Sequence, residues 1–263
     1  MAYRGSAYAT STGVEGPSIH LAAEQLRPFV GRRVRTVSGN SRIGIARFRG
    51  KTVRDIFAWG KHLVFQFDGF ALRVHFMLWG TFAATVKGES VTGDYRRSGA
   101  PRLELIFANG EITIWSASLK FLESGSARDE YDFSVDVMSD DWSPRKALRQ
   151  LRDHADEEIA DVLLDQSVFA GVGNIIKNEV LFRTRTHPLT PVRRLSAARR
   201  KAIVADARTF SFRFLELRRR FVLRKNLEMY GRSACPSCAG RITRKVHGRR
   251  QRRSFYCPAC QKR

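Results

Sequence analysis

The chain has 263 residues, 43% hydrophobic and 11% aromatic, so it can bury a sizeable core and is not a disordered tail. Its formal net charge is +22; 22 of its 47 Lys and Arg, but only 3 of its 25 Asp and Glu, lie between Arg193 and Arg263. This asymmetry indicates a polyanion-binding region, with a solubilising face or anionic-lipid binding as alternatives. No apolar run approaches the roughly 20 residues of a membrane span, and the first residues lack the apolar segment of a secretory signal. We therefore expect a protein of the cytoplasm or nucleoid (nuclear in a eukaryote) with no membrane partner.

The first half of the chain is predicted to be mostly strands. Residues 1–13 are rich in Ala, Ser, Thr and Gly, and we interpret them as an extension, native or left over from cloning. Helical spacing of apolar residues predicts a helix over Ser18–Val30, which Gly31 ends. Short β-branched and aromatic runs with two turn signals then predict an antiparallel sandwich or barrel. The predicted strands cover 63–67, 72–76, 103–107 and 112–115. We assign 14–135 to an N-terminal β-sandwich domain with a flanking helix.

The second half of the chain is predicted to be helical and to end in a small metal module. An acidic, irregular stretch over 136–144 indicates a linker. Periodicity predicts a helical domain over 145–228 and a finger over 229–263, which makes the fold α+β and multidomain. The expected helices cover 145–152, 157–164, 173–184 and 196–220.

Four cysteines provide a specific metal signal. They follow the pattern C-x2-C-x18-C-x2-C and are Cys235, Cys238, Cys257 and Cys260. Two such knuckles complete a tetrahedral sulfur site, which predicts one Zn²⁺ with a structural role, since no coordination position stays open. The alternative is two disulfides, for which nothing indicates the necessary secretion. Between the knuckles a basic β-hairpin is expected over Arg241–Tyr256, suited to a DNA groove.

An ordered set of motifs makes the chain resemble a known family. The set comprises Glu15-Gly16-Pro17 before a helix, Gly60-Lys61 ahead of a strand pair, GVGNIIKNE over 171–179, and the ending FYCPACQK over 255–262. In this order the chain resembles the formamidopyrimidine-DNA glycosylase / endonuclease VIII family over nearly all of Val14–Arg263. The valine at position 14 is most like the valine-type branch, the third endonuclease-VIII-like glycosylases. The resemblance implies a helix–two-turn–helix domain, a zinc-finger β-hairpin and a monomer that binds damaged double-stranded or single-stranded DNA.

The resemblance also implies roles for individual residues. Val14 matches the residue whose amine is the nucleophile, and Glu15 matches the acid that protonates the sugar ring oxygen. Lys61 matches a lysine that contacts phosphate beside the lesion. The implied DNA-binding residues are Asn174 and Arg252, which match phosphate contacts, and Met77, Leu78 and Trp79, which match a wedge.

These roles have physical reasons of their own. An α-amino group, with a reference pKa of about 7.7–8.0, is substantially unprotonated near pH 7–8, whereas a lysine at about 10.4 is not. Removing a base requires everting it at a cost of a few kcal/mol, which an apolar wedge in the vacated stack offsets. The alternatives are a helix-start acid for Glu15, a surface lysine for Lys61 and a buried strand end for the wedge.

One departure from the family pattern affects the chemistry. Gly13 stands where the family has its initiator Met, so the nitrogen of Val14 is an amide in the chain as written. Residues 1–13 are then foreign to the native start, or are removed by proteolysis, or the chain uses Glu15 to activate water or only binds DNA. We expect a base-excision DNA glycosylase for oxidised bases with abasic-site lyase activity when Val14 is exposed. The alternatives are a non-catalytic zinc-dependent DNA-binding protein and a zinc-ribbon RNA-binding or transcription factor.

Overall fold

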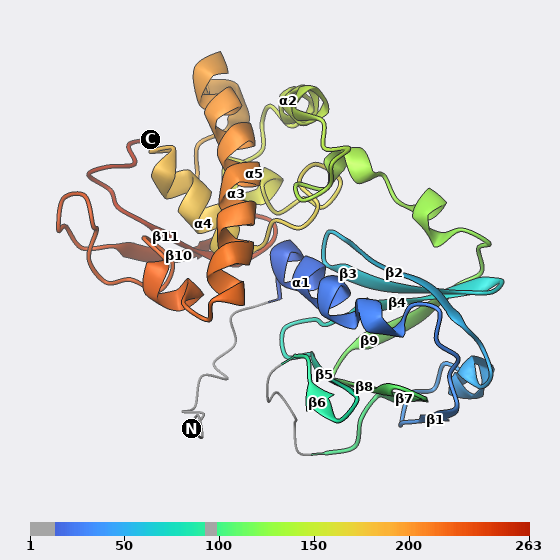
Figure 1. Cartoon of the computed structure of the whole chain (residues 1–263). Coiled ribbons are helices and arrows are strands. Elements are labelled where there is room, and N and C mark those ends of the chain that lie inside the picture. The colour runs from blue at the N-terminus through green and yellow to red at the C-terminus, as the bar shows by residue number, and fades with distance from the viewer. Residues whose placement is uncertain (1–13, 93–98) are drawn as a thin grey trace.

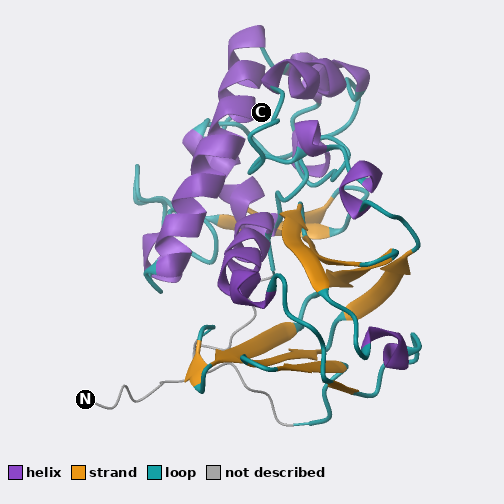
Figure 2. Ribbon diagram, turned by 45° about the vertical axis from the view of Figure 1, so that its right-hand side comes forward, coloured by secondary structure: helices purple, strands orange, loops and turns teal. Residues whose placement is uncertain are grey.

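The computed structural model describes residues 14–92 and 99–263, so the predicted extension over 1–13 lies outside the described residues. Two halves stand side by side, a β-sandwich and a mainly helical half, and α1 (Gly16–Leu26) lies at their junction (Figure 1). Figure 2 shows the helices gathered in one half and the two sheets of the sandwich in the other. The predicted α+β architecture is confirmed.

The N-terminal half is an antiparallel sandwich of two sheets. One sheet has the order β1 (Thr36–Ser38), β7 (Leu103–Phe107), β8 (Gly110–Trp115), β5 (Thr81–Val86) and β6 (Glu89–Ser90). The other has the order β2 (Val53–Trp59), β3 (His62–Phe67), β4 (Phe70–His75) and β9 (Ser118–Leu122). The Asn109-Gly110 turn pairs β7 with β8, and the Asp68-Gly69 turn pairs β3 with β4, as the turn signals predicted.

Aromatic side chains and α1 close this sandwich. Phe48, Phe67 and Phe70 are fully buried, and the rings of Phe67 and Phe70 stack with centroids 5.1 Å apart. The helix buries Ile19, Ala22 and Leu26, which share one face at helical spacing, against the same core. It ends at Leu26 and not at Val30 as expected. Pro28 lacks an N–H and clashes with the preceding turn, so the chain continues as a single 3₁₀ turn over Arg27–Phe29.

The helical half is built around α4 (Asn174–Arg183), which is buried over almost its whole circumference. It packs against α5 (Ala197–Arg219), which in turn contacts α2 (Pro144–Asp153). The helix α3 (Ile159–Val162) is shorter than the predicted 157–164. Its chain turns early because the Asp165 carboxylate accepts hydrogen bonds from the backbone and hydroxyl of Ser167.

The C-terminal finger, residues 229–263, is a hairpin of β10 (Thr243–His247) and β11 (Arg252–Tyr256). Its small core of Met229, Phe255 and the cysteines is continued by Phe182 of α4. Within the described ranges, none of the helices is both long and apolar enough to cross a membrane.

Candidate active site

The Glu15 carboxylate joins the two halves of the molecule. It is 2% exposed and lies at the start of α4, although Glu15 itself precedes α1. Its oxygens accept hydrogen bonds from three backbone N–H groups, those of Ile175 at 2.6 Å, Ile176 at 3.1 Å and Gly173 at 3.2 Å. These are the N–H groups that a helix leaves unpaired at its first turn, where the dipole also favours negative charge. The alternative, in which Glu15 is an acid at the start of a helix, is therefore correct only in part. The carboxylate caps α4, and not α1, which follows Glu15 in the chain.

Glycines allow this close approach. The backbone N–H of Gly16 donates to the carbonyl of Gly171 over 2.8 Å, and a Cβ on Gly16 would lie 2.6 Å from the Gly171 Cα. A Cβ on Gly173 would lie 2.5 Å from the Glu15 carboxyl carbon. Gly171 also has a φ of +96°, which favours glycine. The GVGN turn is thus shaped to receive the first residues of the sandwich half.

Lys61 lies between the two halves in the electrostatic field of Glu15 and the finger. Burial lowers the pKa of Lys61, with Arg252 and Arg250 adding to the shift while Glu15 opposes it. Burial likewise raises the pKa of Glu15, against Lys61 and the three backbone N–H groups. The structure therefore brings Glu15, Lys61 and Arg252 together from three regions of the sequence.

Asp136 holds the turn that carries Lys61. It is fully buried, and its Oδ2 accepts a hydrogen bond from the backbone N–H of Gly60 at 2.8 Å, while its Oδ1 accepts one from Met138. In the sequence this acid belongs to the stretch 136–144 that was interpreted as an irregular linker. No pattern in the sequence distinguished it, because its partner lies 76 residues away.

Val14 is half-buried at the rim of a cavity. The cavity has a volume of about 440 Å³ and is lined by α1, β5 and the end of α5, with Arg218 and Phe221 among its residues. Phe221 is 75% exposed, the most exposed large hydrophobic side chain of the described residues. The nitrogen of Val14 therefore lies beside a space of mixed apolar and basic lining, next to the capped carboxylate of Glu15.

The predicted wedge residues occupy an exposed loop between β4 and β5. Met77, Leu78 and Trp79 are 56%, 51% and 58% exposed. The loop is tight, because the N–H of Gly80 donates to the carbonyl of Phe76 at 2.7 Å and a Cβ on Gly80 would lie 2.3 Å from that oxygen. The alternative of a buried strand end is wrong for these three side chains.

Asn174 is the first residue of α4, next to the Glu15 cap. Its side chain is partly buried, and its Oδ1 has no hydrogen-bond partner. A side-chain amide presented at a helix N-terminus, with the dipole behind it, suits an anionic group. Arg252, in contrast, lies on β11 with an exposed side chain.

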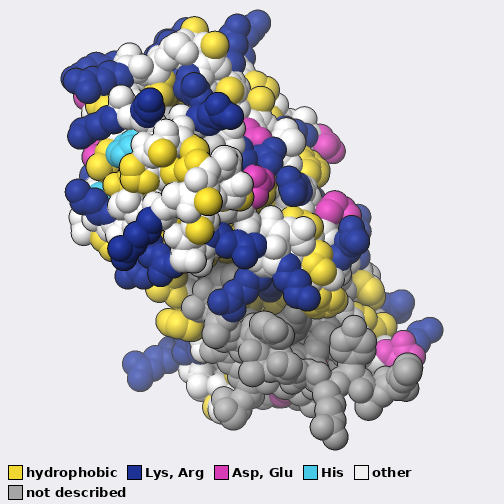
Figure 3. Space-filling model, turned by 90° about the vertical axis from the view of Figure 1, so that its left-hand side faces the viewer, with side chains coloured by type: hydrophobic (Ala, Val, Ile, Leu, Met, Phe, Trp, Pro, Cys, Tyr) yellow, Lys and Arg dark blue, Asp and Glu magenta, His cyan; other side chains and the backbone are white. Residues whose placement is uncertain are grey.

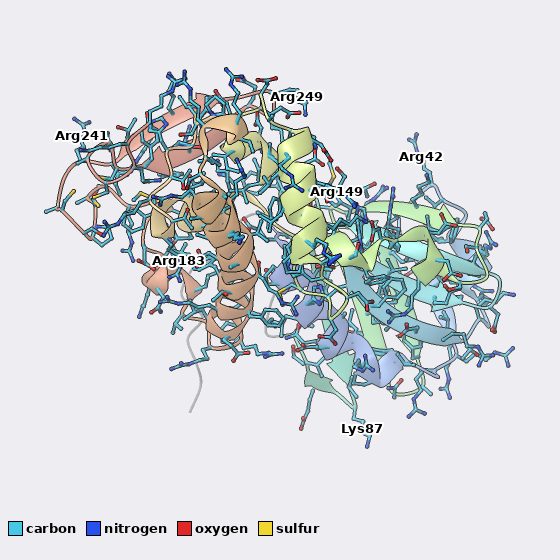
Figure 4. All side chains as sticks on the ribbon, turned by 90° about the horizontal axis from the view of Figure 1, so that it is seen from above. Arg42, Lys87, Arg149, Arg183, Arg241 and Arg249 are labelled. Atoms are coloured by element: carbon cyan, nitrogen blue, oxygen red, sulfur yellow. The ribbon has the colours of Figure 1, made fainter. Side chains whose placement is uncertain are left out.

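The tip of the finger is docked on the helical half and is not free. The Asp161 carboxylate accepts hydrogen bonds from the backbone N–H groups of Arg249 at 2.6 Å and Arg250 at 3.4 Å. The guanidinium of Arg250 pairs with Asp165 at 2.6 Å. Figure 4 shows Arg241 and Arg249 at opposite ends of the finger. These acidic partners were not predicted from the sequence, because they lie more than 80 residues before the hairpin.

Basic side chains nevertheless cover much of the surface of this half. Figure 3 shows Lys and Arg spread over the helical half and the finger, with few Asp and Glu between them. The position of this surface agrees with the charge asymmetry of the sequence.

The four cysteines form one cluster. The sulfurs of Cys235, Cys238, Cys257 and Cys260 all lie within 4.8 Å of one another. The Cys238–Cys257 and Cys235–Cys260 sulfurs are 3.5 and 3.8 Å apart, well beyond a disulfide bond of about 2.05 Å. Four thiols at these distances fit a tetrahedral zinc ion.

A further group of buried polar residues lies on α4, inside the GVGNIIKNE motif, and no individual role was predicted for these residues. Lys177, Asn178 and Glu179 are all 0% exposed. Glu179 accepts hydrogen bonds from the backbone N–H groups of Glu228, Met229 and Tyr230, the segment that enters the finger. In the sequence these three polar residues stand between two pairs of apolar residues. This pattern could have indicated buried polar contacts, because a buried helix carries polar side chains only when they are paired.

Known proteins with related sequences cover nearly the whole chain. A model described as the formamidopyrimidine-DNA glycosylase H2TH domain matches residues 134–213. Endonuclease 8-like 3 is 30% identical in Mus musculus (82% of this chain, 35% of that protein) and 29% identical in Homo sapiens (98% and 42%). The probable endonuclease 8 2 of Streptomyces coelicolor is 28% identical over 94% of this chain and 93% of its own length. The chain thus spans well under half the length of the two mammalian relatives.

Solved structures share the fold. The Lactococcus lactis formamidopyrimidine-DNA glycosylase, in a crystal with DNA containing an abasic site, superposes with a TM-score of 0.81 at 20% identity, over 95% of this chain and 100% of its own. A viral DNA glycosylase gives 0.80 at 20% identity, over 94% and 100%. With the matching domain model and the relatives, this similarity shows that the chain belongs to the formamidopyrimidine-DNA glycosylase / endonuclease VIII family.

Proposed function

We propose that this protein is a base-excision DNA glycosylase that everts and removes oxidised bases, with abasic-site lyase activity when the Val14 amine is free. One observation carries the proposal: the buried Glu15 carboxylate is fixed by three backbone N–H groups directly beside Val14, in the electrostatic field of Lys61. A carboxyl group held this firmly is a pre-organised proton donor or acceptor. The family resemblance gives it the role of protonating the sugar.

In the proposed reaction, Glu15 gives its proton to the deoxyribose ring oxygen as the Val14 amine attacks C1′. The C1′–N bond to the damaged base breaks, and the base leaves with its electron pair and takes up the proton that the amine loses. The C1′–O4′ bond then breaks onto the protonated ring oxygen, and the amine nitrogen and C1′ form a Schiff base. The Schiff base acidifies the 2′ proton. Loss of that proton expels the 3′ phosphate by β-elimination. Burial raises the pKa of Glu15, which keeps its carboxyl group closer to protonated near neutral pH and supports the acid role.

DNA is proposed to bind across the junction of the two halves. Lys61, Asn174 and Arg252 supply positive charge and an amide for phosphates around the damaged nucleotide. Met77, Leu78 and Trp79 enter the gap that the everted base leaves. We propose that the four cysteines hold one Zn²⁺, which keeps the finger folded and takes no part in the chemistry.

The second candidate is a non-catalytic protein that binds damaged or unusual DNA. It is favoured by the position of Val14 behind Gly13, which makes its nitrogen an amide in the chain as written. An amide has no lone pair available for attack on C1′. The two candidates therefore differ in whether the peptide bond between Gly13 and Val14 is intact.

Incision assays separate the two candidates. The full chain and a version beginning at Val14 are incubated with oligonucleotides carrying thymine glycol, a hydantoin or an abasic site, with and without borohydride. The enzyme proposal expects base release, and a trapped covalent adduct from the version that begins at Val14. If that version leaves every damaged oligonucleotide intact while binding it, the non-catalytic candidate is correct.

A further inference from the structure

Lys177 is a buried charge that the proposed reaction does not use. It lies on α4, one turn after Asn174, and is 0% exposed. Burying an ammonium group costs several kcal/mol unless it is paired or hydrogen-bonded. Its contacts therefore indicate what the burial achieves.

Lys177 and its neighbour hold the strand that carries Arg252. The Lys177 Nζ donates to the Ser254 hydroxyl at 2.8 Å and to the carbonyl of Arg253 at 3.2 Å. Asn178 Oδ1 accepts from the backbone N–H of Phe255 at 2.8 Å. Three successive residues of β11, directly after Arg252, are thus bonded to side chains of α4.

The Ser254 hydroxyl extends these contacts into a row across the finger. It lies 2.7 Å from His247 Nε2, and His247 Nδ1 lies 2.9 Å from the Glu158 carboxylate. Because the carboxylate can only accept, we assign the Nδ1–H as donor. Nε2 of a neutral imidazole then accepts from Ser254, whose oxygen accepts from Lys177. The row is satisfied at every step and ties α4 to β11, β10 and the segment before α3.

The first turn of α4 is fixed as firmly to the other half of the molecule. Its N–H groups bind Glu15, and its next turn binds β11. One rigid helix therefore sets the position of the Arg252 backbone relative to the Glu15 carboxylate. A long exposed arginine reaches a given phosphate only from a fixed backbone position.

We propose that Lys177 is a positioning residue that, through Ser254 and the carbonyl of Arg253, sets Arg252 against the phosphate beside the damaged nucleotide. The proposal rests on the proposed function for the role of Arg252. It assigns Lys177 no contact with DNA, since its side chain is fully enclosed.

A double-mutant cycle tests this coupling. Binding to a fluorescent duplex with a tetrahydrofuran abasic analogue is measured across a KCl series for K177M, R252A and the double variant. Loss of one charge-assisted phosphate contact predicts roughly 10-fold weaker binding for K177M, and a salt slope lower by about one. The same values are expected for R252A, and the double variant is expected to bind no more weakly than R252A alone. The matched control is K201M, which removes the same charge from an exposed position on α5.

Two outcomes overturn the proposal: wild-type affinity in K177M, or losses that add in the double variant. Zinc content is measured in parallel. If K177M loses zinc, S254A replaces it, since this variant keeps the lysine charge but removes its acceptor; additive loss with R252A, or no loss, then refutes the coupling. A version beginning at Val14 that binds the duplex but cuts no damaged DNA contradicts the proposed function alone.

Discussion

Glu15 shows how one side chain can serve two purposes. Its carboxylate completes the first turn of α4, so any movement of the acid costs the helix its hydrogen bonds. Conversely, those three donors hold the carboxylate in one place, which suits the proton transfer proposed for it. Exchanging the carboxyl group for an amide removes the acidic proton, while the remaining oxygen still accepts part of these hydrogen bonds.

E15Q is expected to lose base excision by 100-fold or more, a typical magnitude for general acid catalysis, because the amide has no proton to give. The version beginning at Val14 with this change should still form a borohydride-trapped adduct on abasic DNA, where the base has already left. Single-turnover excision and trapping are compared with E24Q, an exposed glutamate on α1. Equal loss of excision and trapping would contradict the assignment of the acid.

Lys177 gives a pH dependence of stability. Burial lowers the pKa of Lys177 to about 7. The charge of Arg252 adds to this shift, whereas Asp161 and Glu15 oppose it. His247 contacts the Ser254 hydroxyl that accepts from Lys177. The unfolded chain retains an ordinary lysine pKa near 10.4, so it binds more protons than the folded chain between pH 7 and 10. The free energy of unfolding of wild type relative to K177M should therefore rise with pH in this range, by at most about 1.4 kcal/mol per pH unit. Urea unfolding of both proteins at pH 6.5, 8 and 9.5 measures it, and a constant difference contradicts the expectation.

The β4–β5 loop is the element that presents the proposed wedge. Left-handed backbone at Met77, with a φ of +54°, and the close contact at Gly80 hold three large apolar side chains in solvent. A soluble protein rarely exposes such a cluster without a use for it. An everted base leaves a gap between stacked bases, which apolar side chains can fill.

W79A is expected to slow excision from duplex DNA roughly 10-fold, because the vacated stack is less well filled, while excision from single strands stays near wild type. V30A, which shortens an exposed apolar side chain elsewhere in the sandwich half, serves as the control. Equal slowing on both substrates would show that Trp79 contacts the damaged nucleotide and does not fill the gap.

Elements with strong local patterns were predictable from the sequence, and contacts between distant elements were not. Four strands of the sandwich (β3, β4, β7 and β8), the cysteine knuckles and the helices at 173–184 and 196–220 follow from periodicity, turn residues and spacing, whereas β1, β2, β5, β6 and β9 were not predicted. The docking of the Arg249–Arg250 tip on Asp161 joins residues 88 and 89 apart, for which one sequence carries no local signal. The same holds for Glu15 and α4, where only the family resemblance indicated that the acid matters.

At the scale of the whole molecule, the backbones of the two halves meet at Gly16 and Gly171. The contact of Gly16 with Gly171 leaves no space for a side chain on Gly16. The separation of the halves, and with it the geometry of Glu15 and Lys61, depends on this contact.

G16A is expected to destabilise the protein by about 1–3 kcal/mol, because the added methyl group pushes the two backbones apart. It should reduce excision more than it reduces affinity for DNA, since the charges that bind phosphate remain. Thermal unfolding and single-turnover rates are compared with G125A, where an added Cβ meets no atom within 4 Å. Unchanged stability in G16A would show that the two backbones can move apart to make room for the methyl group, which contradicts the expectation.

In the proposed reaction, three consecutive residues at this junction have three separate tasks. The amine of Val14, the acid of Glu15 and the backbone of Gly16 follow one another without a spare position. A cut one bond late would give the free amine to Glu15, and a cut one bond early would leave Val14 acylated. A mechanism that uses this amine therefore tolerates no ragged amino terminus, and a preparation with mixed ends would be active only in the fraction that begins at the correct residue.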